Sequence, residues 1–102
     1  MSRYTIEMNF TKARQQAKQL ENAAFRLERI ASGSMEDAMN SISGNWKGEN
    51  AGNYLKKAEK VQNDIHKVSK ELKNTAQAIE RIAKVTYDAE IAALELALKR
   101  NI

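Results

Sequence analysis

The sequence has no cysteine and no proline, and its 102 residues include only four glycines, one tryptophan and one histidine. Without cysteine, the chain has neither a disulfide nor a thiolate for a metal site or for nucleophilic catalysis. The single histidine, His66, follows the apolar Ile65 and has no second histidine or metal-spaced partner. An enzyme needs a nucleophile or base in a pocket that excludes water. We therefore expect no catalytic residue, no metal, no cofactor and no enzymatic activity.

Long hydrophobic runs are also absent. The polar segment Met1–Lys18 lacks the apolar core of about 7–15 residues that a secretory signal has. No segment approaches the ~20 apolar residues that cross a bilayer. These absences do not place the protein in the cytosol, because some export routes take folded proteins.

Charged residues make up 29% of the chain and hydrophobic residues 42%, which is ordinary for a soluble protein. Alanine, glutamate, lysine, leucine and arginine dominate, as in long helices and coiled coils. We expect one domain, 1–102, and a chain this small is marginally stable unless it is cross-linked or associated. Self-association or a partner chain is the remaining route to stability.

The first half of the chain is expected to form a short arm, 1–10, followed by a helix over about 11–43. Ile6, Met8 and Phe10 alternate with polar residues, which favours an extended arm, and Asn9 or Thr11 is suited to cap the helix. The helix is expected to continue through Gly33, with a kink there at most, because the apolar spacing keeps its phase. Apolar or small residues with alternating spacings of four and three predict the face that packs on another helix: Ala13, Ala17, Leu20, Ala24, Leu27, Ala31, Ser34, Ala38 and Ile42.

The second half predicts a longer helix, over about 47–98, because no glycine or proline interrupts it after Gly52. The chain is therefore expected to be all-α, an antiparallel two-helix hairpin that pairs into a four-helix bundle dimer. The predicted packing face again follows spacings of three and four: Tyr54, Ala58, Val61, Ile65, Val68, Leu72, Thr75, Ile79, Ile82, Thr86, Ala89, Ala93 and Leu96.

A turn is expected at 44–47, where Gly44, the Trp46-Lys47-Gly48 tripeptide and Gly52 lie close together. Gly44 is well placed to end the first helix in a left-handed conformation, and Asn45 or Asn50 to cap the second. Because Gly48 and Gly52 are one helical turn apart, they leave a patch without side chains. Trp46 beside this patch either plugs the end of the bundle or serves as a binding hot spot for a partner, and the two roles are compatible.

Large apolar residues also lie beside the predicted packing faces or near the C-terminal end of the second helix, where that longer helix is expected to extend beyond the first. A helix that is apolar over this much of its circumference is buried from several sides or binds a partner. We therefore predict a dimer or partner surface that includes Phe25, Met39, Ile91, Leu94 and Leu98.

A Trp-x-Gly tripeptide between two helices of this kind resembles the WXG family, the early-secreted-antigen-like proteins of type VII secretion. The resemblance covers nearly the whole chain as architecture, with Trp46 and Gly48 as the signature pair. It implies a turn motif, dimers of two hairpins, and export of the folded dimer by a membrane-bound ATPase machine in Gram-positive bacteria and mycobacteria. The chain is then expected to be secreted without a cleavable signal and to be cytoplasmic before export.

The family also carries a Tyr-x-x-x-Asp/Glu export signal on its second helix, and the chain departs from it. Tyr87 is the only tyrosine there, and its fourth following residue is Ile91. A degenerate pair of Tyr87 and Glu90 shares one helix face at i,i+3 spacing. The signal otherwise belongs to a partner chain, or this branch uses another one.

The resemblance therefore favours a type VII secretion substrate, or an accessory partner that dimerises with itself, with a related hairpin or with a larger LXG-type toxin. Two alternatives remain open at this stage. The first is a coiled-coil subunit that is not exported. The second is a basic helical hairpin that binds nucleic acid, suggested by the net charge of +4. Carboxylates lie among the lysines of the second helix, however, so we expect protein partners and no nucleic acid.

Overall fold

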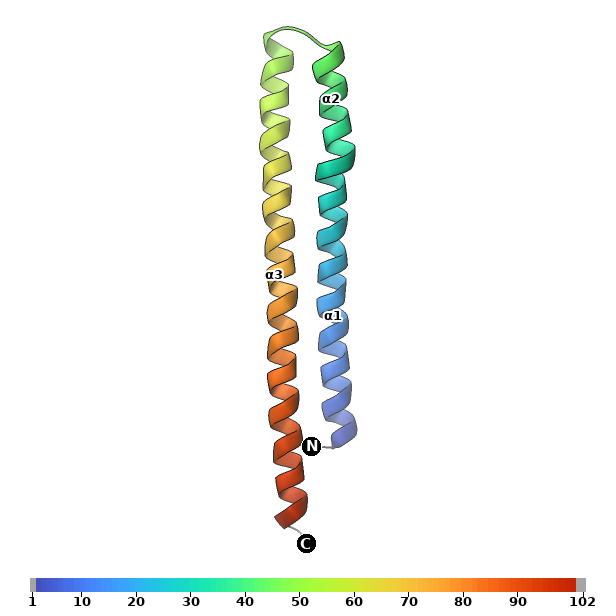
Figure 1. Cartoon of the computed structure of the whole chain (residues 1–102), viewed down its shortest axis with the longest axis vertical. Helices are drawn as coiled ribbons and strands as arrows, with labels where there is room; N and C mark the ends of the chain where they lie inside the picture. The colour runs from blue at the N-terminus through green and yellow to red at the C-terminus, as the bar shows by residue number, and fades with distance from the viewer. Residues whose placement is uncertain (1, 101–102) are drawn as a thin grey trace. The chain divides into compact units, whose positions relative to one another are not determined.

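The computed structural model describes residues 2–100, and nearly all of them are helical (Figure 1). The elements are α1 (Arg3–Arg29), a π-helix η1 (Ile30–Met35), α2 (Glu36–Asn45) and α3 (Glu49–Arg100). No described residue lies in a strand, and the prediction of an all-α helical hairpin is confirmed. The expected domain 1–102 includes residues 1, 101 and 102, which lie outside the described residues.

The chain divides into two compact units, each of which pairs two helical segments. Unit 1 combines Met1–Glu21 with Asn74–Ile102, and unit 2 is Asn22–Lys73. In unit 1 the described chain begins and ends at the same end of the pair, so its two segments are antiparallel (Figure 1). In unit 2 the turn between α2 and α3 reverses the chain.

The expected extended arm at 1–10 is wrong, because α1 begins at Arg3. Ser2 caps this helix: its Oγ accepts a hydrogen bond from the Thr5 amide at 3.1 Å, and its carbonyl accepts one from the Ile6 amide at 3.1 Å. Neither Asn9 nor Thr11 is therefore a helix cap. The alternating pattern is misleading because Ile6, which is buried, is also in helical spacing with later inward residues of α1, namely Phe10, Ala13 and Ala17.

Small side chains occupy most of the buried positions of both units, and Ile6 in unit 1 and Gln62 in unit 2 are the larger exceptions. In unit 2, Ala24 and Ala31 are fully buried, and in unit 1 Ala17 and Ala76 are almost fully buried. Side chains of this size allow the backbones of two facing helices to approach closely. The core of each unit is therefore thin, and it contains few large hydrophobic residues.

Two hydrogen bonds from α3 fix the register of unit 2. The Ser69 hydroxyl donates to the Ala24 carbonyl oxygen at 2.9 Å, and the Gln62 amide nitrogen donates to the Ala31 carbonyl oxygen at 2.7 Å. Both α3 residues are buried. The two bonds are one heptad apart on each helix and run in opposite directions, as an antiparallel pair requires. Buried polar groups need such partners, so a slip of one residue would leave both donors unpaired.

The face of α3 that packs inside each unit differs in part from the predicted one. Ala58, Ile65, Leu72 and Ile79 are half-buried, as predicted. Up to Ile82 every second predicted position is instead exposed, and the residue after it is the inward one. From Ile82 onward all the predicted positions are exposed. Exposed are Tyr54 (55%), Val61 (50%) and Val68 (45%) in unit 2, and Ile82 (62%) and Leu96 (53%) in unit 1. Inward are Leu55, Gln62, Ser69, Ala76 and Ala83.

The physical reason for this difference is the size of the residues that α1 presents. Buried alanines bring the backbone of α1 and η1 close to α3, so the facing positions of α3 must be small or must donate to that backbone. Ser69 and Gln62 meet this requirement, whereas Val68 and Val61 do not donate hydrogen bonds. The predicted packing face was chosen by hydrophobicity, so it placed Val61 and Val68 in the interior instead of the polar residues that follow them.

The helix continues through Gly33 as expected, but residues Ile30–Met35 are wound as a π-helix. A π-helical turn contains more residues than an α-helical turn, so it rotates the inward face of the following helix. After the buried Ala31, the half-buried positions include Met35, Met39 and Ile42, while the predicted positions Ser34 and Ala38 are exposed. The predicted packing face of 13–42 is therefore wrong at these two residues.

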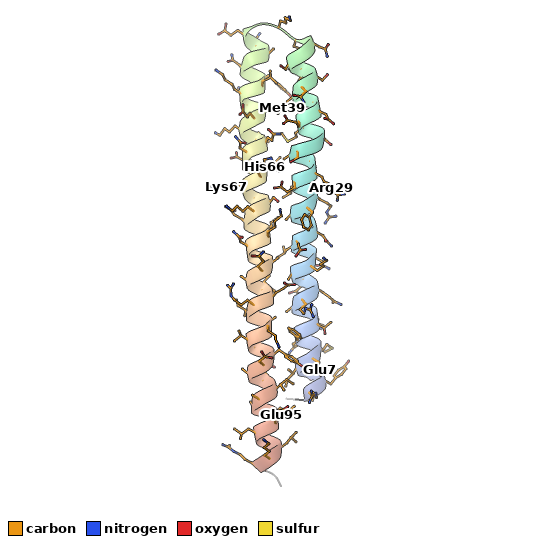
Figure 2. The ribbon with its side chains drawn as sticks, viewed as in Figure 1. Glu7, Arg29, Met39, His66, Lys67 and Glu95 are labelled. Carbon is orange, nitrogen blue, oxygen red and sulfur yellow. The ribbon has the colours of Figure 1, made fainter. Side chains whose placement is uncertain are left out.

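In unit 2, His66 Nδ1 lies 3.3 Å from a Glu28 carboxylate oxygen, within hydrogen-bond distance. Both side chains are half-exposed, and in Figure 2 His66 and Met39 lie between the two ribbons of this unit, whereas Arg29 and Lys67 point outward. The hydrogen bond with His66 is the main cause that lowers the pKa of the Glu28 carboxyl, and the nearby Ser69 hydroxyl lowers it further. The buried Ser69 hydroxyl donates to the Ala24 carbonyl, so the three side chains do not form an exposed nucleophile with its base.

This pair predicts a loss of stability in acid. Because the folded-state pKa of Glu28 lies below its ordinary value of 4.5, the ionised carboxylate stabilises the fold above that pH. The stabilisation is lost as the pH falls through the lowered pKa. Chemical denaturation should show wild type more stable than Glu28→Gln near neutral pH, with the difference shrinking below pH 4.5. Glu59→Gln, which removes an exposed carboxylate of the same unit, is the control; a difference independent of pH would contradict the assignment.

Candidate functional site

The candidate site is the turn between α2 and α3, in unit 2. α2 ends at Asn45, and the Trp46 amide still donates to the Ile42 carbonyl oxygen at 2.8 Å. Trp46 itself leaves the helix with extended backbone angles, φ −108° and ψ 135°. The side-chain nitrogen of Asn45, Nδ2, donates to the Ser41 carbonyl oxygen at 2.9 Å. Asn45 therefore serves the end of α2, and the prediction that it caps the second helix is wrong.

Gly48 is the residue on which the turn depends. It has φ +112°, and no other described residue has a positive φ. L-amino acids with a Cβ rarely adopt such angles. The Gly48 carbonyl oxygen accepts a hydrogen bond from the Gly52 amide at 3.2 Å, so Gly48 precedes the first turn of α3. The predicted left-handed residue, Gly44, lies inside α2 instead, and the predicted cap Asn50 lies inside α3.

Trp46 and Tyr54 form an exposed aromatic pair beside this turn. Their ring centroids are 6.4 Å apart with an interplanar angle of 47°. Trp46 is 60% exposed and Tyr54 55% exposed. A Trp that plugged the end of a helix pair would be covered, so within unit 2 Trp46 is a surface residue.

Gly52 has no packing role within the described chain. A Cβ added to Gly52 or to Gly44 would meet no atom within 4 Å. The patch without side chains that the sequence predicts at Gly52 is therefore open to solvent, and no helix of this chain approaches it closely.

The aromatic pair continues along α3 into an exposed apolar row. We call Tyr54, Val61 and Val68 the α3 stripe; its members are half or nearly half exposed. They are seven residues apart, which places them on one face of a helix that packs in the manner of a coiled coil. The sequence analysis assigned all three to the interior of the hairpin, because heptad spacing indicates a helix-packing face without showing which helix covers it.

Tyr87 and Glu90, the predicted degenerate signal, lie on α3 in unit 1. The Tyr87 ring stacks on Phe10, with centroids 4.6 Å apart and an interplanar angle of 28°. Lys84 Nζ lies 5.7 Å from the Tyr87 ring centroid and also bonds Asp88 at 2.8 Å. Tyr87 and Glu90 line the same apolar hollow, of about 280 Å³, together with Ile6, Phe10 and Ile79 among others. The two side chains thus share a face.

The predicted partner-surface residues differ in exposure. Phe25 is 48% exposed, with Lys73 Nζ 5.2 Å above its ring, and Leu98 is 57% exposed. Met39, Ile91 and Leu94 are half-buried. Leu94 lines a second hollow of unit 1, with Ile6 and Glu90. The chain's own packing therefore covers part of Met39, Ile91 and Leu94, whereas Phe25 and Leu98 are the more accessible members.

The fold and the site together define a class: an all-α helical hairpin with a Trp-x-Gly tripeptide in the turn. The model of a protein family described as WXG100, proteins of 100 residues with WXG, matches residues 5–90. The chain belongs to the WXG100 family. No curated protein and no solved structure matches it. Among the described residues, no helix has both the length and the hydrophobicity of a membrane span.

The glycines of the turn give a matched set of variants. Gly48→Ala forces a side chain into a positive-φ conformation and should destabilise the chain by about 1–3 kcal/mol. Gly44→Ala and Gly52→Ala, which lie in helices beside open space, should stabilise it by up to about 1 kcal/mol. Urea denaturation of the three variants checks this ranking. A neutral Gly48→Ala would contradict the assigned turn geometry.

Proposed function

We propose that this chain is a type VII secretion substrate or accessory partner that pairs with a second helical hairpin and is exported folded. The partner is a second copy, another WXG-like protein or the helical domain of an LXG-type toxin. The secretion ATPase is the further partner, and contact with the membrane occurs only through the secretion apparatus. The protein is cytoplasmic before export and secreted without a cleavable signal peptide.

The observation that carries this proposal is the α3 stripe beside the exposed Trp46. Removing a valine side chain fully from water contributes about 1.5–3 kcal/mol, and the half-exposed members of the stripe leave about half of this contribution unrealised. A heptad row is complementary to another helix packed alongside it. A helical partner is therefore the occupant that the spacing favours.

The thin core supports pairing for a second reason. Buried alanines contribute little hydrophobic stabilisation, and a chain of about a hundred residues with one shared packing face is marginal by itself. Unit 1 likewise exposes Ile82 and Leu96, which are two heptads apart on α3. Each unit, described by itself, has large apolar residues on α3 that a partner would cover.

Trp46, which pairs with Tyr54 at the end of the α3 stripe, supplies a further recognition element. Tryptophan and tyrosine are, with arginine, enriched among binding hot spots, and the two aromatic side chains bury large areas with few rotatable bonds. The family's Tyr-x-x-x-Asp/Glu signal is interrupted here by Ile91, and Tyr87 is stacked on Phe10. We infer that the Trp46 motif acts together with a signal that the partner chain supplies.

Replacing Trp46 tests the proposal. Trp46→Ala should abolish most export, because docking loses its main aromatic contact, while far-UV circular dichroism retains the wild-type helicity. Trp46→Phe keeps an aromatic ring and should retain part of the export. The measurement is the amount of protein outside intact cells after culture fractionation.

Met8→Ala serves as the control, since Met8 lies on α1 in unit 1, away from the turn residues in sequence. Wild-type export of Trp46→Ala would contradict the proposal. Equal losses of helicity and export would assign Trp46 a purely structural role. The absence of wild-type protein and of its partner from the medium would favour the coiled-coil subunit that is not exported.

A further inference from the structure

The amide of Gln62 is the buried polar group of unit 2 that reaches the π-helix. Its nitrogen donates to the Ala31 carbonyl oxygen at 2.7 Å and to Glu36 Oε2 at 2.6 Å. Both partners are acceptors, so the nitrogen end of the amide must face them. Ala31 lies in η1, and Glu36 is the first residue of α2. Gln62 therefore holds both ends of this segment from the facing helix.

The π-helix changes which residues of the following helix face α3. Ala24 and Ala31 are buried one heptad apart, and a continuous α-helix would next place Ala38 on that face. Ala38 is exposed instead, and the next residue, Met39, is half-buried. The wider π-helical turn adds one residue to the spacing from Ala31. Without it, α2 would be rotated by about 100° relative to the preceding helix, the angle of one residue.

Trp46 moves with α2, because its amide is bonded to the Ile42 carbonyl oxygen. The winding of η1 therefore determines on which side of α2 the Trp46 side chain emerges. In the observed winding it emerges beside Tyr54, with ring centroids 6.4 Å apart. Tyr54 begins the α3 stripe, so the same winding makes the aromatic pair continuous with the exposed apolar row.

We propose that Gln62 is a positioning residue for the Trp46 motif, because its amide keeps Ile30–Met35 in the π-helical winding that turns Trp46 toward Tyr54. Only the consequence for docking rests on the proposed export function. The positioning itself is a property of the purified chain and can be measured without any partner or secretion assay.

The chain offers its own reporter, because Trp46 is its single tryptophan. Gln62→Leu keeps a side chain of similar size and removes the amide donor. We expect a shifted tryptophan emission maximum, changed acrylamide quenching and a shifted Met39 methyl resonance, with helicity retained by circular dichroism. Asn63→Leu, which alters the exposed neighbouring residue, should leave all three signals at their wild-type values.

Deletion of Gly33 separates positioning from simple stabilisation. The deletion restores the heptad spacing from Ala31 to Met39 in a continuous α-helix, so Met39 and Trp46 should keep their wild-type signals without the π-helical turn. Adding Gln62→Leu to this deletion should then change the Trp46 and Met39 signals no further. If Gln62→Leu alone does not fold, the double variant should fold, because its register no longer requires the amide.

Three results would overturn the proposal. The first is a Gln62→Leu variant that melts at a lower temperature with unchanged Trp46 and Met39 signals, which would limit Gln62 to stabilising the helix pair. The second is a Gln62→Leu shift that persists in full after Gly33 is deleted. The third is a double variant that fails to fold. Wild-type export of Gln62→Leu with all spectroscopic predictions met would contradict only the proposed function, in which docking depends on the Trp46 motif.

Discussion

The close approach of facing helical backbones, made possible by buried alanines, is the constraint on which the rest of the structure depends. Ala24 and Ala31 are fully buried in unit 2, and each presents its carbonyl oxygen to a donor on α3. The Ser69 side chain is small enough to fit against that backbone, and the Gln62 side chain donates to it directly. These two hydrogen bonds set the register, and a larger apolar residue in their place would leave the carbonyls without these donors and would separate the helices.

The same constraint explains why large apolar residues lie on the outside. With the inner positions of α3 reserved for small or donating side chains, Val61 and Val68 fall on the flank of the helix, where they are half exposed. Tyr54 extends that flank to the turn, where it meets Trp46. Among the described residues, every buried side-chain polar atom has a hydrogen-bond partner, whereas several large hydrophobic side chains stay about half exposed. This combination suits a subunit that folds locally and gains its remaining stability by binding another helical chain.

Much of this fold follows from the sequence, and its failures have definite causes. Apolar spacing without proline predicts both long helices, and the clustered glycines around Trp46 locate the turn. The start of α1 was missed because six alternating residues are also compatible with a helix, and the Ser2 cap decides between them. The inner face was misjudged where burial is set by backbone approach, since hydropathy ranks Val68 above Ser69. The π-helix has no periodic signal of its own in the sequence. Its consequence in the structure is that Met39 faces inward in place of Ala38.

The candidate site was predicted in part for similar reasons. Trp46 and Gly48 were identified from their pattern, and the positive φ of Gly48 gives the glycine a physical role. Gln62 escaped notice because a glutamine on a helix is ordinarily solvated, and its burial depends on the carbonyl of a residue 31 positions earlier. The exposure of Tyr54 was likewise invisible, because a tyrosine on a heptad position fits an inner and an outer face equally well.

The central claim is that the α3 stripe is covered by a second helical hairpin. Sedimentation equilibrium tests this most directly, with the purified chain measured alone and mixed with products of neighbouring genes. We expect wild type to form a dimer in at least one of these samples. Val68→Glu should associate at least about tenfold more weakly, whereas Lys67→Glu, whose side chain points outward (Figure 2), should associate as wild type does. A folded monomer in every mixture, or wild-type association of Val68→Glu, would contradict the account.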